Sequence, residues 1–251
     1  MEGMNQNVME GAEAVFNEGN EIGIVVLHGF TGTVQSMKPL VDAYTAHGYT
    51  MACPRLKGHG TTPYDMEGST AEDWIRSAEE AFEWVKNRCD CVFVTGLSLG
   101  GTLSLYLAST REVDGVAVIN PAIDVPDMSS LADSESRFID AIGSDIKKEG
   151  ATELAYDKTP VRSLNHLTNI MAKVHEQLSE VSAPLLVFTS EEDHVVPPEN
   201  SQTIFDMVFS EGKELVPLED SYHVATLDND QELIIERTLE FFEKYFNAKE
   251  N

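Results

Sequence analysis

Residues 91–107, with the sequence CVFVTGLSLGGTLSLYL, contain the pattern that decides the fold. A β-branched and aromatic run leads into Gly96-Leu97-Ser98-Leu99-Gly100, and a helical pattern follows. A strand that enters a helix through so tight a turn needs small residues two positions before and after the serine. The turn raises the Ser98 hydroxyl above the sheet and leaves the N–H of Leu99 free at a helix N-terminus. A bare G-x-S-x-G also occurs in ordinary loops, so it is the strand and helix on either side that predict a nucleophilic serine.

Length and charge restrict the class of protein. The 251 residues suffice for one α/β domain with a full core and an insertion. The 43 acidic and 17 basic residues give a formal charge of −26, which disfavours nucleic acid and anionic membranes as partners. The acidic residues are spread along the chain, so they do not form an acidic tail.

The cysteines and the N-terminus predict a cytoplasmic protein. Cys53, Cys89 and Cys91 are odd in number and show neither C-x-x-C nor zinc-site spacing, so we expect reduced thiols and no metal site. Residues 1–16 lack the basic and apolar regions of a signal peptide, and no apolar run reaches membrane-spanning length. We therefore expect no integral membrane segment.

Continuous apolar runs predict strands that are buried on both faces of a parallel sheet. After a short candidate at residues 14–16, these runs lie at 22–27, 49–54, 113–120, 183–190 and 213–218. Helices are predicted at 35–46, with Gly48 just after the helix end, and after Ser69-Thr70-Ala71-Glu72, which is interpreted as a capping box. Alternating strands and helices indicate an α/β fold.

Two histidine-containing loops follow predicted strands on the N-terminal side of the serine. The run at 22–27 ends in His28-Gly29-Phe30-Thr31-Gly32, where the N–H of Phe30 could point into the same space as the N–H of Leu99. His28 is interpreted as a positioning residue. His59, in a Gly-His-Gly loop, is interpreted as a solvated side chain outside the catalytic set.

Residues 122–182 are too long for an ordinary connection between a strand and a helix. We predict a helical cap inserted into an α/β core that comprises residues 1–121 and 183–251. Its second half, residues 160–180, has helical periodicity. If that helix covers the site, its apolar face would form the substrate pocket; the alternative is an ordinary crossover helix packed beside the sheet. The predicted pocket residues are Leu164, Leu167, Ile170 and Met171.

A serine hydroxyl is a weak nucleophile unless a base removes its proton. His223, in a loop after the run at 213–218, can be that base, and Asp193, in an Asp-x-x-x-Pro loop after the run at 183–190, can orient it. Ser98, Asp193 and His223 each follow a different strand, and the carboxyl ends of parallel strands share one sheet edge. Because Asp193 ends a run of three acids, Glu192 remains the reserve candidate for the acid.

The chain resembles the α/β-hydrolase superfamily, and within it the small bacterial carboxylesterases and monoacylglycerol lipases. The resemblance rests on residues 27–32 (LHGFTG), 57–60 (KGHG) and 96–101 (GLSLGG), on Thr159-Pro160 in the predicted cap, and on Ser221 before the histidine. It implies a mostly parallel sheet, a small helical cap, no cofactor, and ester hydrolysis through an acyl-enzyme whose oxyanion is held by the N–H groups of Phe30 and Leu99. The chain departs from the usual pair of small residues before the histidine, because it has Ser221-Tyr222.

Other activities use the same residues. A thioesterase or an acyltransferase would need the same triad, and a non-catalytic ligand-binding relative would normally have lost a triad member. An aspartate at position 98 would indicate a dehalogenase and a cysteine a dienelactone hydrolase, so Ser98 argues against both. The expected partner is a small-molecule ester of a short- or medium-chain acid, with monoacylglycerols as one candidate. The sequence leaves open whether the protein is a monomer or a homodimer.

Overall fold

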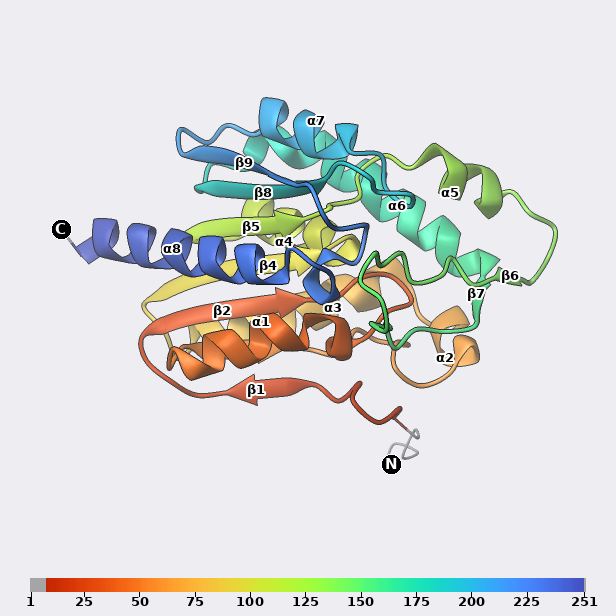
Figure 1. Ribbon diagram of the computed structural model, residues 1–251, viewed down its shortest axis with the longest axis horizontal. Coiled ribbons are helices and arrows are strands. Elements are labelled where there is room, and N and C mark those ends of the chain that lie inside the picture. Colours follow the sequence, from red (N-terminus) through yellow and green to blue (C-terminus); the bar gives the residue numbers. More distant parts are fainter. Residues whose placement is uncertain (1–7, 251) are drawn as a thin grey trace.

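The computed structural model describes residues 8–250; residues 1–7, the start of the N-terminal stretch considered above, lie outside this part. A seven-stranded sheet with the order β1-β3-β2-β4-β5-β8-β9 forms its centre (Figure 1). β1 pairs antiparallel with β3, and the other neighbours pair in parallel, which confirms the predicted mostly parallel sheet. The strands are β1 (Val15–Asn17), β2 (Ile22–Leu27), β3 (Thr50–Cys53), β4 (Cys91–Leu97), β5 (Gly115–Ile119), β8 (Leu185–Ser190) and β9 (Lys213–Leu218).

Helices cover both faces of this sheet. Ile24 and Val26 of β2 face the apolar cluster that includes α1 (Val34–Ala46) and α8 (Gln231–Glu250). Val25 and Leu27 face the opposite cluster, with α3 (Ala71–Lys86), α4 (Leu99–Thr110) and α7 (Glu199–Met207). A strand covered on both faces needs apolar residues at every position, which explains the unbroken apolar runs.

Helix ends follow the local capping chemistry. The Thr33 side chain caps α1, and Gly48, with a φ of 79°, follows its C-cap. The capping box of α3 lies one residue later than predicted, because Thr70 and Asp73 form it. The Ser69 hydroxyl instead donates to the Met66 carbonyl and accepts from the Trp74 indole N–H, so it cannot cap the helix.

The chain between β5 and β8 passes beyond the carboxyl ends of the strands and then returns beside the sheet to the start of β8 (Figure 1). It forms α5 (Pro126–Ala132), a two-stranded sheet of β6 (Phe138–Asp140) and β7 (Lys158–Pro160), α6 (Val161–Gln177) and the 3₁₀ turn η1 (Leu178–Glu180). The short helix α2 (Pro63–Glu67), from the N-terminal half, packs near β7 and α6, and a second 3₁₀ turn, η2 (Ala225–Leu227), precedes α8. Within residues 8–250, no helix combines the length and the apolar character needed to cross a bilayer.

Candidate active site

Ser98 lies at the junction of β4 and α4 in a backbone conformation that side chains rarely adopt. Its φ is 55° and its ψ is −119°, and its N–H donates a 2.9 Å hydrogen bond to the carbonyl of Ile119 on β5. A side chain at position 96 would overlap the backbone of Gly100, and one at position 100 would overlap the carbonyl of Leu27. Strain of this kind persists only where the surroundings impose it. Close packing of the two glycines therefore forces the turn that presents Ser98.

Asp193 and His223 meet although they follow different strands. The Oδ2 atom of Asp193 lies 2.7 Å from the Nδ1 atom of His223, and their side chains are only 2% and 8% exposed. The second oxygen of Asp193 accepts hydrogen bonds from the N–H groups of Val195 and Val196, each of 2.8 Å. A carboxylate can only accept, so Nδ1 carries the proton and Nε2 is the basic nitrogen of neutral His223.

The charges around His223 favour its protonated form. Burial alone would lower the pKa of His223, but the nearby carboxylates of Asp193, Glu153 and Asp145 outweigh burial and raise it. A base whose imidazolium is stabilised in this way suits proton removal from a serine hydroxyl.

Glu192, the reserve candidate, does not reach His223. Its side chain is 59% exposed, and its Oε2 atom lies 3.1 Å from the Nζ atom of Lys147. The structure thus brings Asp193, and not Glu192, to the histidine.

Ser98 and His223 line one small cavity of about 30 Å³. Its wall also includes Gly29 and Phe30 from the loop after β2. Leu99 is the first residue of α4, so its N–H has no carbonyl within the helix to bond. Of the two residues whose N–H groups are predicted to hold the oxyanion, Phe30 lines this cavity and Leu99 directly follows Ser98.

The predicted substrate pocket needs correction. Leu164, Leu167, Ile170 and Met171 are almost fully buried in the apolar cluster shared by α3, α4 and α5, and they do not line the cavity at Ser98. The apolar face of α6 packs against α4 and α5 and so serves the core. The apolar side chains at the cavity are instead Met128, Ile142, Val195 and Val224, together with Phe30 and Leu97.

Sequence reasoning missed two polar residues around the site. Glu153, from the chain between β6 and β7, lines the cavity, and burial raises the pKa of its carboxyl group to about 7. Asn120, at the end of β5, has a φ of 44° and donates a 2.8 Å hydrogen bond to the carbonyl of His223. A polar residue that ends a buried strand was the available signal for Asn120, whereas nothing local marks Glu153.

The two loop histidines are both buried. His28 Nε2 accepts a 3.1 Å hydrogen bond from the N–H of Leu56, and Nδ1 lies 2.9 Å from the carbonyl of Gly29. Burial lowers the pKa of His28 to about 4, so it stays neutral and ties the loop before Phe30 to the chain after β3. The prediction of a solvated His59 is wrong, because its ring is fully buried against the rings of Phe30 and Trp74.

This arrangement defines a class of protein: a sheet of mostly parallel strands that presents a serine on a strained turn, with a histidine and an acid from later strands. Residues 24–236 match the profile of the Alpha/beta hydrolase family, and the chain belongs to that family. It is 50% identical over 242 residues to the thermostable monoacylglycerol lipase of Bacillus sp. (strain H-257), covering 95% of this chain and 97% of that protein.

Two further relatives are lipolytic or esterolytic by name. The carboxylesterase of Bacillus subtilis (strain 168) is 28% identical over 235 residues, which cover 90% of this chain and 94% of the relative. A solved structure reported for the metagenome-derived lipolytic enzymes LipS and LipT superposes with a TM-score of 0.92 at 47% identity, covering 95% of this chain and 100% of that chain.

Proposed function

We propose that this protein hydrolyses carboxylic esters of short- and medium-chain acids, monoacylglycerols among them, through an acyl-enzyme on Ser98. One observation carries the proposal: Ser98, on its strained turn, shares a cavity with a His223 that is hydrogen-bonded to Asp193. The similarity to a monoacylglycerol lipase and a carboxylesterase supports the same reaction class.

The residues have complementary roles in this mechanism. His223 takes the proton of Ser98 through Nε2 as the hydroxyl oxygen attacks the ester carbonyl, and Asp193 stabilises the imidazolium that forms. The N–H groups of Phe30 and Leu99 hold the developing oxyanion. His223 then protonates the leaving alcohol, and water releases the acid by the same steps.

Met128, Ile142 and Val195 line both the small cavity at Ser98 and a neighbouring hollow of about 390 Å³, which offers the room for an acyl chain that the small cavity alone lacks. These walls support an ester with an apolar acyl chain and a hydroxylated alcohol. Met128 and Ile142 offer apolar contact, and the Glu153 carboxyl group offers a hydrogen-bonding partner for the hydroxyl groups of a monoglyceride. Residues 122–182 supply all three side chains, and we assign this segment the role of a cap on the core formed by residues 1–121 and 183–251. The buried unpaired thiols of Cys53, Cys89 and Cys91 suit the cytoplasm that we propose as its location.

Labelling with a fluorophosphonate tests the nucleophile. The parent protein should be labelled and should hydrolyse p-nitrophenyl butyrate, whereas Ser98→Ala should do neither. A parent that resists the probe, or a Ser98→Ala variant that reacts with it, would contradict the proposal.

A series of p-nitrophenyl esters and monoacylglycerols of increasing chain length tests the substrate class. Each buried methylene contributes about 0.8 kcal/mol at most, close to fourfold in kcat/KM, so activity should rise from acetate to a maximum at short or medium chains and then fall. Met128→Ala should flatten this series, while Met207→Ala, on the exposed side of α7, should leave it unchanged. A series that rises to the longest chains would contradict the compact pocket.

A further inference from the structure

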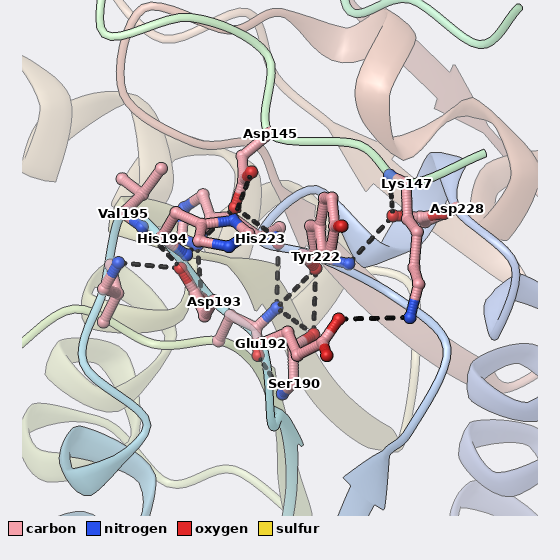
Figure 2. A network of polar contacts seen from close by, with 12 residues as sticks. Asp145, Lys147, Ser190, Glu192, Asp193, His194, Val195, Tyr222, His223 and Asp228 are labelled. Atoms are coloured by element: carbon pink, nitrogen blue, oxygen red, sulfur yellow. Dashed lines mark hydrogen bonds and ion pairs between the residues drawn. The ribbon is translucent and has the colours of Figure 1, made fainter. Parts of the chain in front are cut away.

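Residues 145–148, between β6 and β7, run across the two loops that carry Asp193 and His223 (Figure 2). We call this segment the strap. It belongs to the insertion between β5 and β8, whereas the two loops follow β8 and β9 of the main sheet. Figure 2 shows the strap and both loops joined in one polar network.

Asp145 is the point where the strap contacts both loops. Its Oδ2 atom accepts a 3.0 Å hydrogen bond from the N–H of His194 and a 3.1 Å hydrogen bond from the N–H of His223. Its Oδ1 atom lies 2.8 Å from Nδ1 of the His194 ring, and its carbonyl accepts a 3.0 Å bond from the N–H of Val224. The Asp145 carboxylate therefore joins His194, the residue after the proposed catalytic acid, to His223, the proposed catalytic base.

The next residues of the strap repeat this bridging. The ammonium group of Lys147 lies 3.1 Å from Glu192 in the acid loop and 3.3 Å from Asp220 in the histidine loop. The buried carboxylate of Asp228 accepts hydrogen bonds from the N–H groups of Lys147, Lys148 and Tyr222. These contacts hold the strap in place, so the Asp145 carboxylate has a fixed position.

The position of these loops matters because the Asp193–His223 hydrogen bond joins them through side chains alone. A catalytic constellation must be held within about 0.5 Å of its productive geometry. Asp193 is itself oriented by N–H groups of its own loop, which fixes the carboxylate relative to that loop but not relative to His223. At the bases of the two loops, the Ser190 hydroxyl donates a 2.9 Å hydrogen bond to the Tyr222 carbonyl, and the Asn120 amide donates to Ser190 and to the His223 carbonyl. Asp145 adds a bridge further along the loops, between the residue after Asp193 and His223 itself.

We propose that Asp145 is a positioning residue for the triad, which holds the acid loop and the histidine loop at the separation that the Asp193–His223 hydrogen bond requires. The proposal rests on the proposed function and extends it, since it makes part of the insertion necessary for the alignment of the base. Asp145 does not contact the substrate in this role.

Three variants test the proposal on the full-length protein. Asp145→Ala removes the bridge, Asp145→Asn keeps an oxygen that can accept from both N–H groups, and Glu149→Ala is the matched control, because Glu149 is exposed and lies just beyond the strap. Activity on p-nitrophenyl butyrate is measured per active site, with the sites counted by fluorophosphonate titration, so that losses of folded protein do not count.

We expect Asp145→Ala to lower kcat by up to about 10²-fold with little change in KM, because a misplaced base affects the chemical step. Asp145→Asn should recover most of kcat, and Glu149→Ala should match the parent. If Asp145→Ala does not fold, Asp145→Ser replaces it, since a serine hydroxyl is too short to span the two N–H groups.

The pH profile of kcat/KM supplies a readout that a purely structural role would not move. The charged groups that face His223 are Asp193, Glu153 and Asp145. Removing the charge of Asp145 while keeping its bridge should lower the pKa of His223, so the acid limb of Asp145→Asn should move to lower pH. The proposal would be overturned if Asp145→Ala kept the parent kcat per active site. It would also be overturned if Asp145→Asn lost as much kcat as Asp145→Ala and the acid limb of its pH profile stayed where it is in the parent. An inactive parent would instead contradict the proposed function.

Discussion

Asp193 Oδ2 lies 2.7 Å from His223 Nδ1, whereas the neighbouring Glu192 carboxylate points away and pairs with Lys147. The geometry separates two acids that the sequence presents side by side. Asp193→Asn should lower kcat by about 10⁴-fold, because the amide favours the wrong tautomer of His223. Glu192→Gln should change kcat little. Steady-state kinetics of both variants measure this difference. A large loss of kcat in Glu192→Gln, with a nearly normal kcat in Asp193→Asn, would make Glu192 the catalytic acid instead of Asp193.

Ser98→Ala and His223→Ala should each lower esterase activity by a factor on the order of 10⁴ or more. The serine supplies the attacking oxygen and the histidine supplies the base, so neither residue can take over the role of the other. Circular dichroism should show the parent fold in both variants. A Ser98→Ala variant that hydrolyses p-nitrophenyl butyrate near the parent rate would exclude the proposed mechanism.

Glu153 should make the stability of the protein depend on pH. Burial raises the pKa of Glu153 to about 7, above its value in the unfolded chain, so the folded state holds this proton more tightly. Its contribution to stability is therefore present below about pH 4.5 and is lost as the pH rises through about 7. Urea unfolding between pH 5 and pH 8 should show that Glu153→Gln gains stability relative to the parent as the pH rises. A constant difference between the two proteins would contradict the raised pKa.

Gly100→Ala should disrupt the turn at Ser98. A Cβ atom there would overlap the Leu27 carbonyl, which belongs to the neighbouring strand and cannot move without breaking the sheet. Gly48 is the matched control: it has a φ of 79° and open space around it, so Gly48→Ala should cost only the left-handed penalty of roughly 1–2 kcal/mol. We expect a larger loss of unfolding free energy in Gly100→Ala, together with a loss of kcat that Gly48→Ala does not share. Equal losses in urea unfolding would show that the contact with Leu27 is unimportant.

Local sequence features predicted the framework of the site. The unbroken apolar runs led to the strands, and the glycines around Ser98 led to the turn, because both depend on contacts close to the residues themselves. The capping box lies one residue later than predicted, since Ser69 and Thr70 can both cap a helix and the hydrogen bonds of Ser69 to Met66 and Trp74 decide between them.

Features that depend on distant partners could not be predicted in this way. The periodicity of α6 shows which of its faces is buried but not that α4 and α5 cover it, so Ile170 was assigned to the substrate. Glu153 and Asp145 lie in irregular chain, and their roles come from residues dozens of positions away, such as His194 and His223. Sequence spacing carries no signal for contacts of that kind.

The order of strands β4-β5-β8-β9 also determines when the protein becomes active as it folds. Ser98 follows β4, but Asp193 and His223 arrive only after β8 has docked on β5 and β9 on β8. A growing chain on the ribosome therefore contains Ser98 before it contains the proposed acid and base. In refolding experiments, the fluorescence of Trp74 and Trp84, both in α3, should recover before esterase activity does. Esterase activity thus measures whether the last strands of the sheet, β8 and β9, have paired.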